Sequence, residues 1–140
     1  MDEYKSKTVK INRMASEVYG VLSDLSKFGD IVPPDAEIQD FQATADECTF
    51  TAKGMTMGFR IVDREENKTI KLTGTGKMPF DFFSWIQLKE VAPYDTRMRI
   101  VLHIKLNMMM KMFLKGKIQK GLDSAADRLA MGFNGQTPPQ

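Results

Sequence analysis

The sequence predicts an α+β fold in which a seven-stranded antiparallel sheet wraps around a long C-terminal helix, with two short helices after the first strand. Two observations predict it. The hydrophobic period is two residues from Glu37 to Asn107 and returns to helical spacing from residue 108. The connections between the predicted strands are short, which favours antiparallel hairpins. Strands and helices that are segregated along the chain are typical of α+β domains.

Length and composition are those of one globular domain. The chain has 140 residues, of which 42% are apolar and 27% charged. A single Cys and a single His exclude an internal disulfide and a Cys- or His-rich metal site, so we predict no metal and no cofactor. A net charge of +2 gives no reason to expect a nucleic-acid partner. We expect one domain over residues 4–133 and a mobile tail over residues 134–140.

The N-terminal part predicts one strand and two helices. Residues 4–11 alternate and end in Val9 and Ile11, which predicts the first strand. Asn12 is expected to cap the next helix, because its side chain can accept an orphan backbone N–H. The pair Ser23-Asp24 favours a break and a second short helix. The apolar residues of this region recur at helical steps: Met14, Val18, Leu22, Leu25 and Phe28.

Six more strands and a final helix follow. The strands are predicted over residues 37–43, 46–53, 55–65, 68–77, 80–91 and 95–107. The final helix is predicted over residues 108–133, with Gly132 at its end. Its apolar stripe is expected to pack on the sheet, and about 26 residues at about 1.5 Å each would cross it. The stripe consists of Met110, Phe113, Leu114, Ile118, Leu122, Ala125 and Leu129.

Small residues occupy several positions that the alternation assigns to the inner face of the sheet. Gly74, Gly76, Ser84 and Ala52 lie in neighbouring predicted strands. Small side chains on a concave face leave room between the sheet and the helix. If other side chains fill that room it is ordinary core, and strand glycines also mark bulges. If nothing fills it, it is a pocket lined by Phe, Met and Ile, which we take as the working prediction.

Two segments resemble the START-like superfamily, also called SRPBCC, whose members have the helix-grip fold. ASEVYGVLSDLSKFGDIVP resembles the opening helices of that family. WIQLKEVAPYDTRMRIVLHIKLNMMMKMFLKGKIQKGLDSAADRLA resembles the final hairpin and long helix of its small bacterial members. The resemblance covers residues 4 to about 133 and implies a hydrophobic cavity between sheet and helix. Members include lipid carriers, hormone- and alkaloid-binding proteins, polyketide aromatase/cyclases and co-chaperone-like domains, so no single reaction is implied.

The predicted function is binding or transport of a small hydrophobic molecule or lipid in this cavity. Lys117 flanks the helical stripe and could reach a ligand carboxylate, or its stem packs while its ammonium reaches water. The predicted ligand-binding residues are Phe50, Met57, Phe59, Leu72, Gly74, Gly76, Ser84, Ile86, Met110, Phe113, Leu114 and Lys117.

No residue pattern indicates catalysis. His103 shares strand parity with the polar outer face, and Cys48 shares it with the inner face, which predicts a surface imidazole and a buried, inert thiol. No nucleophile, phosphate-binding or acid–base motif is present. We therefore predict no catalytic residue. A polyketide cyclase-like enzyme is the alternative, with Tyr19 and Ser84 as its polar candidates.

Two surface features leave alternatives open. Phe83 and Trp85 share parity with the polar face, so they are either exposed at an interface, such as that of a homodimer, or turned inward by a bulge. A protein-interaction module with a filled core is the corresponding function. From Lys105 to Lys120 the chain has five Lys and no acid, which indicates a solvated face or transient docking on an anionic membrane.

The sequence contains no apolar run long enough to span a membrane and no signal peptide at its start. We therefore expect a cytoplasmic protein without stable membrane insertion.

Overall fold

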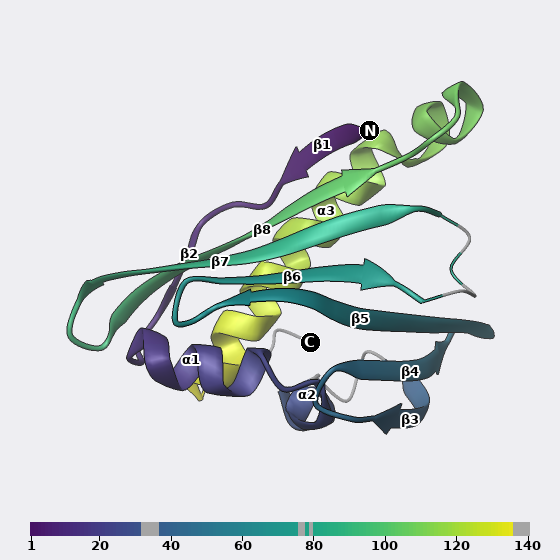
Figure 1. Cartoon of the computed structure of the whole chain (residues 1–140). Coiled ribbons are helices and arrows are strands. Elements are labelled where there is room, and N and C mark those ends of the chain that lie inside the picture. Colours follow the sequence, from purple (N-terminus) through teal and green to yellow (C-terminus); the bar gives the residue numbers. More distant parts are fainter. Residues whose placement is uncertain (32–36, 76–77, 79, 136–140) are drawn as a thin grey trace.

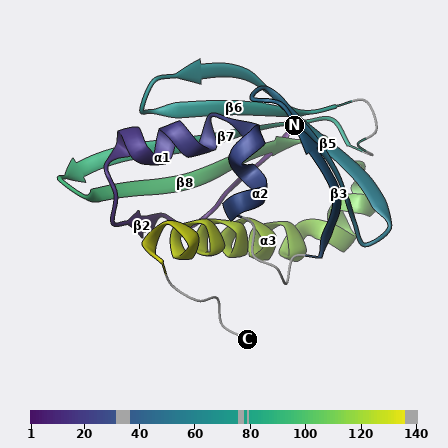
Figure 2. The same cartoon turned by 90° about the horizontal axis from the view of Figure 1, so that it is seen from below.

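A computed structural model describes residues 1–31, 37–75, 78 and 80–135 of the chain. Figure 1 shows a curled antiparallel sheet with the long helix α3 (Met108–Asn134) crossing one of its faces. Figure 2 shows α1 (Ala15–Leu22) and α2 (Phe28–Ile31) at the end of the sheet that faces the viewer, with α2 between the sheet and α3. The predicted α+β class, with a sheet gripping a C-terminal helix, is confirmed.

The sheet is an antiparallel meander, as predicted. Its strand order is β1-β8-β7-β6-β5-β4-β3, and β2 also pairs with β8. The strands of the meander are β3 (Ile38–Ala43), β4 (Glu47–Ala52), β5 (Met55–Glu65), β6 (Thr69–Gly74), β7 (Phe82–Ala92) and β8 (Asp95–Ile104). The two-residue turn between β4 and β5 has positive φ at Lys53 (51°) and Gly54 (76°), the backbone that tight hairpins require.

The predicted first strand is divided in two by a break at Ser6. β1 (Asp2–Lys5) pairs Lys5 with Val101, whereas β2 (Val9–Ile11) pairs Val9 with Met98, a shift of one residue in register. The hydroxyl oxygen of Ser6 accepts a hydrogen bond from the Ile100 N–H at 2.8 Å. The side chain therefore satisfies a buried β8 donor where the ladder is interrupted.

The break between the first two helices lies where the sequence predicts it, but the N-cap residue of α1 is not the predicted one. Asp24 accepts a hydrogen bond from the Ser26 N–H at 3.0 Å and begins the 3-10 helix η1 (Leu25–Lys27). The prediction that Asn12 caps α1 is wrong, because Met14 is the N-cap residue. Glu90, distant in sequence on β7, accepts a hydrogen bond from the Ala15 N–H at 2.9 Å and supplies the missing acceptor.

Only the second half of α3 is packed into the core. Ala126 and Ala130 are buried there and let the helix approach β2 closely, and Phe133 fills the end of the core. Phe113, in contrast, is 73% exposed. The prediction that the apolar stripe packs on the sheet along its whole length is therefore wrong for the first turns.

The C-terminal end of α3 is two residues beyond the predicted Gly132. The helix ends at Asn134, followed by Gly135 in the left-handed conformation (φ 71°). Asn134 holds the N-terminal segment, since its side chain accepts from the Asn12 N–H at 2.7 Å and donates to the Lys10 carbonyl at 3.1 Å. Residues 136–140, the rest of the predicted tail, lie outside the described residues.

The N-cap of α3 provides a stability prediction. The Asn107 side chain accepts a hydrogen bond from the Met110 N–H at 2.8 Å. Asn107→Ala leaves this donor without its partner and should lower the free energy of unfolding by about 1 kcal/mol, measured by urea denaturation. Asn107→Asp keeps an acceptor and should restore the stability. Equal stability of the Ala variant and the parent protein would contradict a structural role for the cap.

Candidate ligand-binding cavity

An apolar cavity of about 350 Å³ lies between the concave face of the sheet and the second half of α3. Strands β4 to β8, the α1–η1–α2 segment and α3 all contribute to its wall. Ala125 of α3 lines the cavity and is also exposed, which places an opening beside the helix. The lining residues are Leu22, Leu25, Phe28, Cys48, Phe59, Leu72, Met78, Phe80, Phe82, Ser84, Ile86, Ile100, Leu102, Ile104, Leu122, Ala125 and Leu129.

Arg64 binds the short segment between α1 and η1, and the residues on either side of it, Leu22 and Leu25, line the cavity. Its guanidinium donates two hydrogen bonds to the Ser23 carbonyl, at 3.1 and 2.9 Å, and pairs with the Asp46 carboxylate at 2.7 Å. These bonds connect the end of α1 to the β3–β4 turn and to β5. The helical side of the cavity is thereby fixed to the strands opposite it.

The described lining offers very little polar chemistry. The one hydroxyl group of the described lining belongs to Ser84, and it donates a hydrogen bond to the Val101 carbonyl at 3.0 Å. The hydroxyl hydrogen is thus used within the sheet. Aromatic rings form one wall, where Phe59 lies 5.6 Å from Phe50 and 6.0 Å from Phe82 between ring centroids. The cavity can surround an apolar molecule, and its described residues leave few groups to orient a polar one.

Two sulfur-containing side chains also line the cavity, the Met78 thioether and the Cys48 thiol, and only the thiol can ionise. Burial raises the pKa of Cys48, a backbone hydrogen bond at Phe59 lowers it less, and the nearby Glu47 charge adds to the rise. The protonated thiol is a weak nucleophile and a small apolar group. The described structure therefore agrees with the buried cysteine that strand parity predicts.

The raised thiol pKa predicts a pH effect on stability. As pH rises above about 8.5, the unfolded state loses the thiol proton first, so the free energy of unfolding should fall. Urea denaturation near neutral pH and in alkaline buffer should show a larger alkaline loss for the parent protein than for Cys48→Ala. The substitution removes no other ionisable group, so the comparison isolates the thiol. Equal losses would contradict the raised thiol pKa.

The structure brings four of the twelve sequence-predicted site residues to the cavity: Phe59, Leu72, Ser84 and Ile86. Phe50 is buried and Met57 half-buried in the adjoining core, without lining the cavity. At Gly74 the room is already filled, because an added Cβ would lie 2.8 Å from both Met78 and Phe82 side-chain carbons. Gly76 lies outside the described residues.

The four predicted residues on α3 lie in its first half and do not line the cavity. Phe113 and Lys117 are exposed, and Met110 and Leu114 are half-buried. The helical wall is made further along α3, by Leu122, Ala125 and Leu129. The sequence reasoning also missed Ile100, Leu102 and Ile104, although the alternation of β8 assigns them to the inner face.

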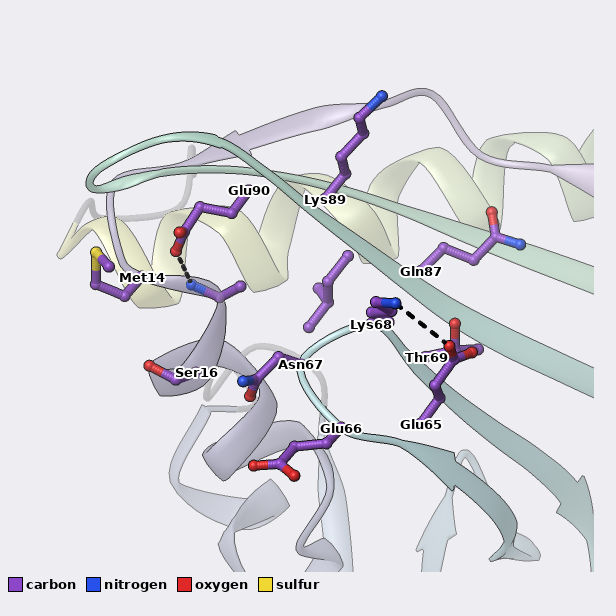
Figure 3. A pocket seen from close by; sticks show the side chains of 12 residues that line it. Met14, Ser16, Glu65, Glu66, Asn67, Lys68, Thr69, Gln87, Lys89 and Glu90 are labelled. Carbon is purple, nitrogen blue, oxygen red and sulfur yellow. Dashed lines mark hydrogen bonds and ion pairs between the residues drawn. The ribbon is translucent and has the colours of Figure 1, made fainter.

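A second hollow, of about 800 Å³, lies between α1, the β5–β6 turn and β7. Figure 3 shows its polar side chains, among them Glu90 directed to the start of α1 and Lys68 directed to Glu65. The Lys68–Glu65 pair, 3.7 Å apart, is exposed to solvent. Because this hollow is a surface groove of solvated charges and contains no predicted site residue, we take the apolar cavity as the candidate site.

The outer aromatic residues of β7 are not turned inward. The β7–β8 register runs without a shift from Phe82 to Glu90, so Phe83 and Trp85 lie on the outer face and are half-buried. Trp85 packs edge-on against His103, with ring centroids 4.6 Å apart. The Lys71 ammonium lies over the Phe83 and Trp85 rings at 4.7 and 5.3 Å. A homodimer through these residues stays a prediction.

Among the described residues, no group of His, Cys, Asp and Glu side chains is arranged to hold a metal ion. No described helix is long and apolar enough to cross a membrane.

Three solved structures share the fold at low sequence identity. The di-domain ARO/CYC BexL from the BE-7585A biosynthetic pathway is 12% identical with a TM-score of 0.75, over 94% of this chain and 46% of that chain. A START superfamily protein from Mycobacterium smegmatis is 16% identical with a TM-score of 0.67, over 95% and 94%. The Aha1 dimer from Colwellia psychrerythraea is 19% identical with a TM-score of 0.66, over 94% and 98%.

No curated protein matches the chain in sequence. A family model described as polyketide cyclase / dehydrase and lipid transport matches residues 6–130. This match includes every strand of the sheet except β1 and nearly all of α3. The chain therefore belongs to the polyketide cyclase / dehydrase and lipid transport family, in agreement with its resemblance to START-like proteins.

Proposed function

We propose that the protein binds a small hydrophobic molecule or lipid in the cavity between its sheet and α3. The observation that carries this proposal is the apolar wall of a cavity of about 350 Å³, within the size range of small-molecule sites. Water in such a cavity finds few hydrogen-bond partners. An apolar ligand would replace it and remove its own surface from water, worth about 25 cal/mol per Å² before the costs of association.

The described lining has few polar groups, and this scarcity favours carriage or sequestration of a ligand over catalysis. A cyclase needs groups that orient a polyketide and move protons. Ser84 already donates its hydroxyl hydrogen to Val101, and Tyr19 is half-buried on α1 without lining the cavity. The family description, which includes lipid transport, supports a ligand carried without reaction.

The test is native mass spectrometry of the purified protein, followed by solvent extraction of any co-purified molecule. We expect an added mass that disappears on extraction and belongs to an apolar compound. The uncharged probe N-phenyl-1-naphthylamine should then bind the extracted protein with increased fluorescence. A protein that carries no added mass and does not bind the probe would refute the proposal. Turnover of a bound compound, lost in Tyr19→Phe, would favour the enzyme instead.

A further inference from the structure

Four large apolar side chains are exposed together at the start of α3. Met108 is 81% exposed, Met109 69%, Met112 82% and Phe113 73%. Met109, Met112 and Phe113 are spaced i, i+3 and i+4, so they share one side of the helix, and Met108 lies one turn before Met112. From here on, the term apolar stripe denotes these four exposed residues and not the seven-residue set that the sequence predicts.

The apolar stripe is not part of the core. The residues of α3 that are buried, Ala126, Ala130 and Phe133, lie more than a dozen residues further along the helix. A Cβ added at Gly116, the next position on the Met109–Phe113 side, would meet no atom within 4 Å. Figure 1 shows the first turns of α3, in light green, extending past the sheet. Contiguous exposed apolar surface of this kind marks an interaction site.

Positive charge surrounds the apolar stripe. Lys105, Lys111, Lys115, Lys117 and Lys120 lie between residues 105 and 120, and this segment contains no acidic residue. Lys111 pairs with Asp2 at 3.0 Å. The other four form no ion pair with any side chain in the described part of the chain. The surface thus combines an apolar strip with several uncompensated ammonium groups.

The combination of apolar side chains and lysines discriminates between three partners that could cover this surface: a second copy of the chain, a soluble anion and a bilayer. A second copy placed against the stripe would bring two sets of lysines together, and their repulsion opposes association. A soluble anion would satisfy the lysines but leave the four apolar side chains in water. A bilayer with anionic headgroups satisfies both, because it offers phosphates at the surface and acyl chains a few ångströms below.

We propose that the first turns of α3 dock the protein on the surface of an anionic bilayer. The apolar stripe enters the boundary between headgroups and acyl chains, and the lysine ammonium groups contact lipid phosphates while their stems lie along the apolar layer. The docking is peripheral, in keeping with the absence of a membrane-spanning helix among the described residues. It does not require the cavity to hold a ligand, so it can fail or succeed independently of the proposed function.

The test is co-sedimentation of the full chain with vesicles. At about 0.1 M NaCl, the protein should bind vesicles of phosphatidylcholine with about 30% phosphatidylglycerol at least about tenfold more strongly than phosphatidylcholine alone. At about 1 M NaCl, where the screening length falls to about 3 Å, most of the bound protein should be released. Absence of binding to the anionic vesicles would overturn the proposal.

Variants locate the surface. The double variant Met112→Ser/Phe113→Ser changes two exposed residues, so the fold should be retained, and vesicle affinity should fall at least about tenfold. The matched control is Val91→Ser/Tyr94→Ser, which changes two residues that are 51% and 63% exposed at the β7–β8 turn. This control should bind as the parent does. If both variants have the same affinity for the vesicles, the proposal is overturned. It is also overturned if sedimentation velocity shows a dimer that Phe113→Ser dissociates.

Discussion

Ser84→Phe is expected to weaken the binding of an uncharged apolar probe strongly while the protein remains folded. Ser84 lies near the start of β7, lines the cavity and faces the helix layer. A benzyl group there would occupy a large part of about 350 Å³ of free space. Because the space is already present, the ring should enter it with little of the overpacking strain of a filled core. The affinity for N-phenyl-1-naphthylamine should fall at least about tenfold.

The matched control is Lys89→Phe on the same strand. Lys89 is exposed and has the opposite parity, so its replacement adds the same ring to the outer face. Probe titration and circular dichroism of both variants separate loss of the cavity from loss of the fold. Unchanged probe affinity in a folded Ser84→Phe protein would place the binding site elsewhere.

Most of the fold could be predicted from the sequence because its signals are local. The alternation of apolar residues assigns β5 its observed bounds, and the Gly54 turn predicts the β4–β5 hairpin. The break between α1 and η1 follows from Asp24, a residue that caps the helix it precedes. Each of these features depends on neighbours a few residues apart.

Features that depend on distant residues could not be predicted in this way. The N-terminal cap of α1 comes from Glu90, 75 residues from Ala15 along the chain. The shift between β1 and β2 depends on how Ser6 meets Ile100 of β8. Local periodicity carries no information about either contact.

The candidate site could be predicted only in part, because some of its residues follow from local alternation and others from tertiary contacts. Parity correctly places Leu72, Ser84 and Ile86 on the inner face, where they line the cavity. Along α3, however, the same residue types form the exposed and the buried halves. The half that meets the sheet is set by the close approach at Ala126 and Ala130, which requires the tertiary structure. Helical spacing alone therefore predicts Phe113 at the cavity, whereas the structure exposes it.

Truncation of two inner residues of β6 should lower the stability by unequal amounts, and the difference tests whether the cavity is empty. Ile70 is fully buried, pairs with Ile86 and is surrounded by core side chains. Ile70→Ala should lower the free energy of unfolding by about 2–5 kcal/mol, since truncation leaves a void that the core cannot collapse around. That is a large share of the total stability of about 5–15 kcal/mol for a domain.

Leu72→Ala is the matched control, two residues away on the same face of the same strand. Leu72 is half-buried and borders the cavity, so part of its surface has no partner atoms to lose. Its truncation should cost clearly less than that of Ile70, measured by urea denaturation of the ligand-free protein. If the two variants lose equal stability, the space beside Leu72 is filled, and the interaction module with a packed core becomes the better account of this fold.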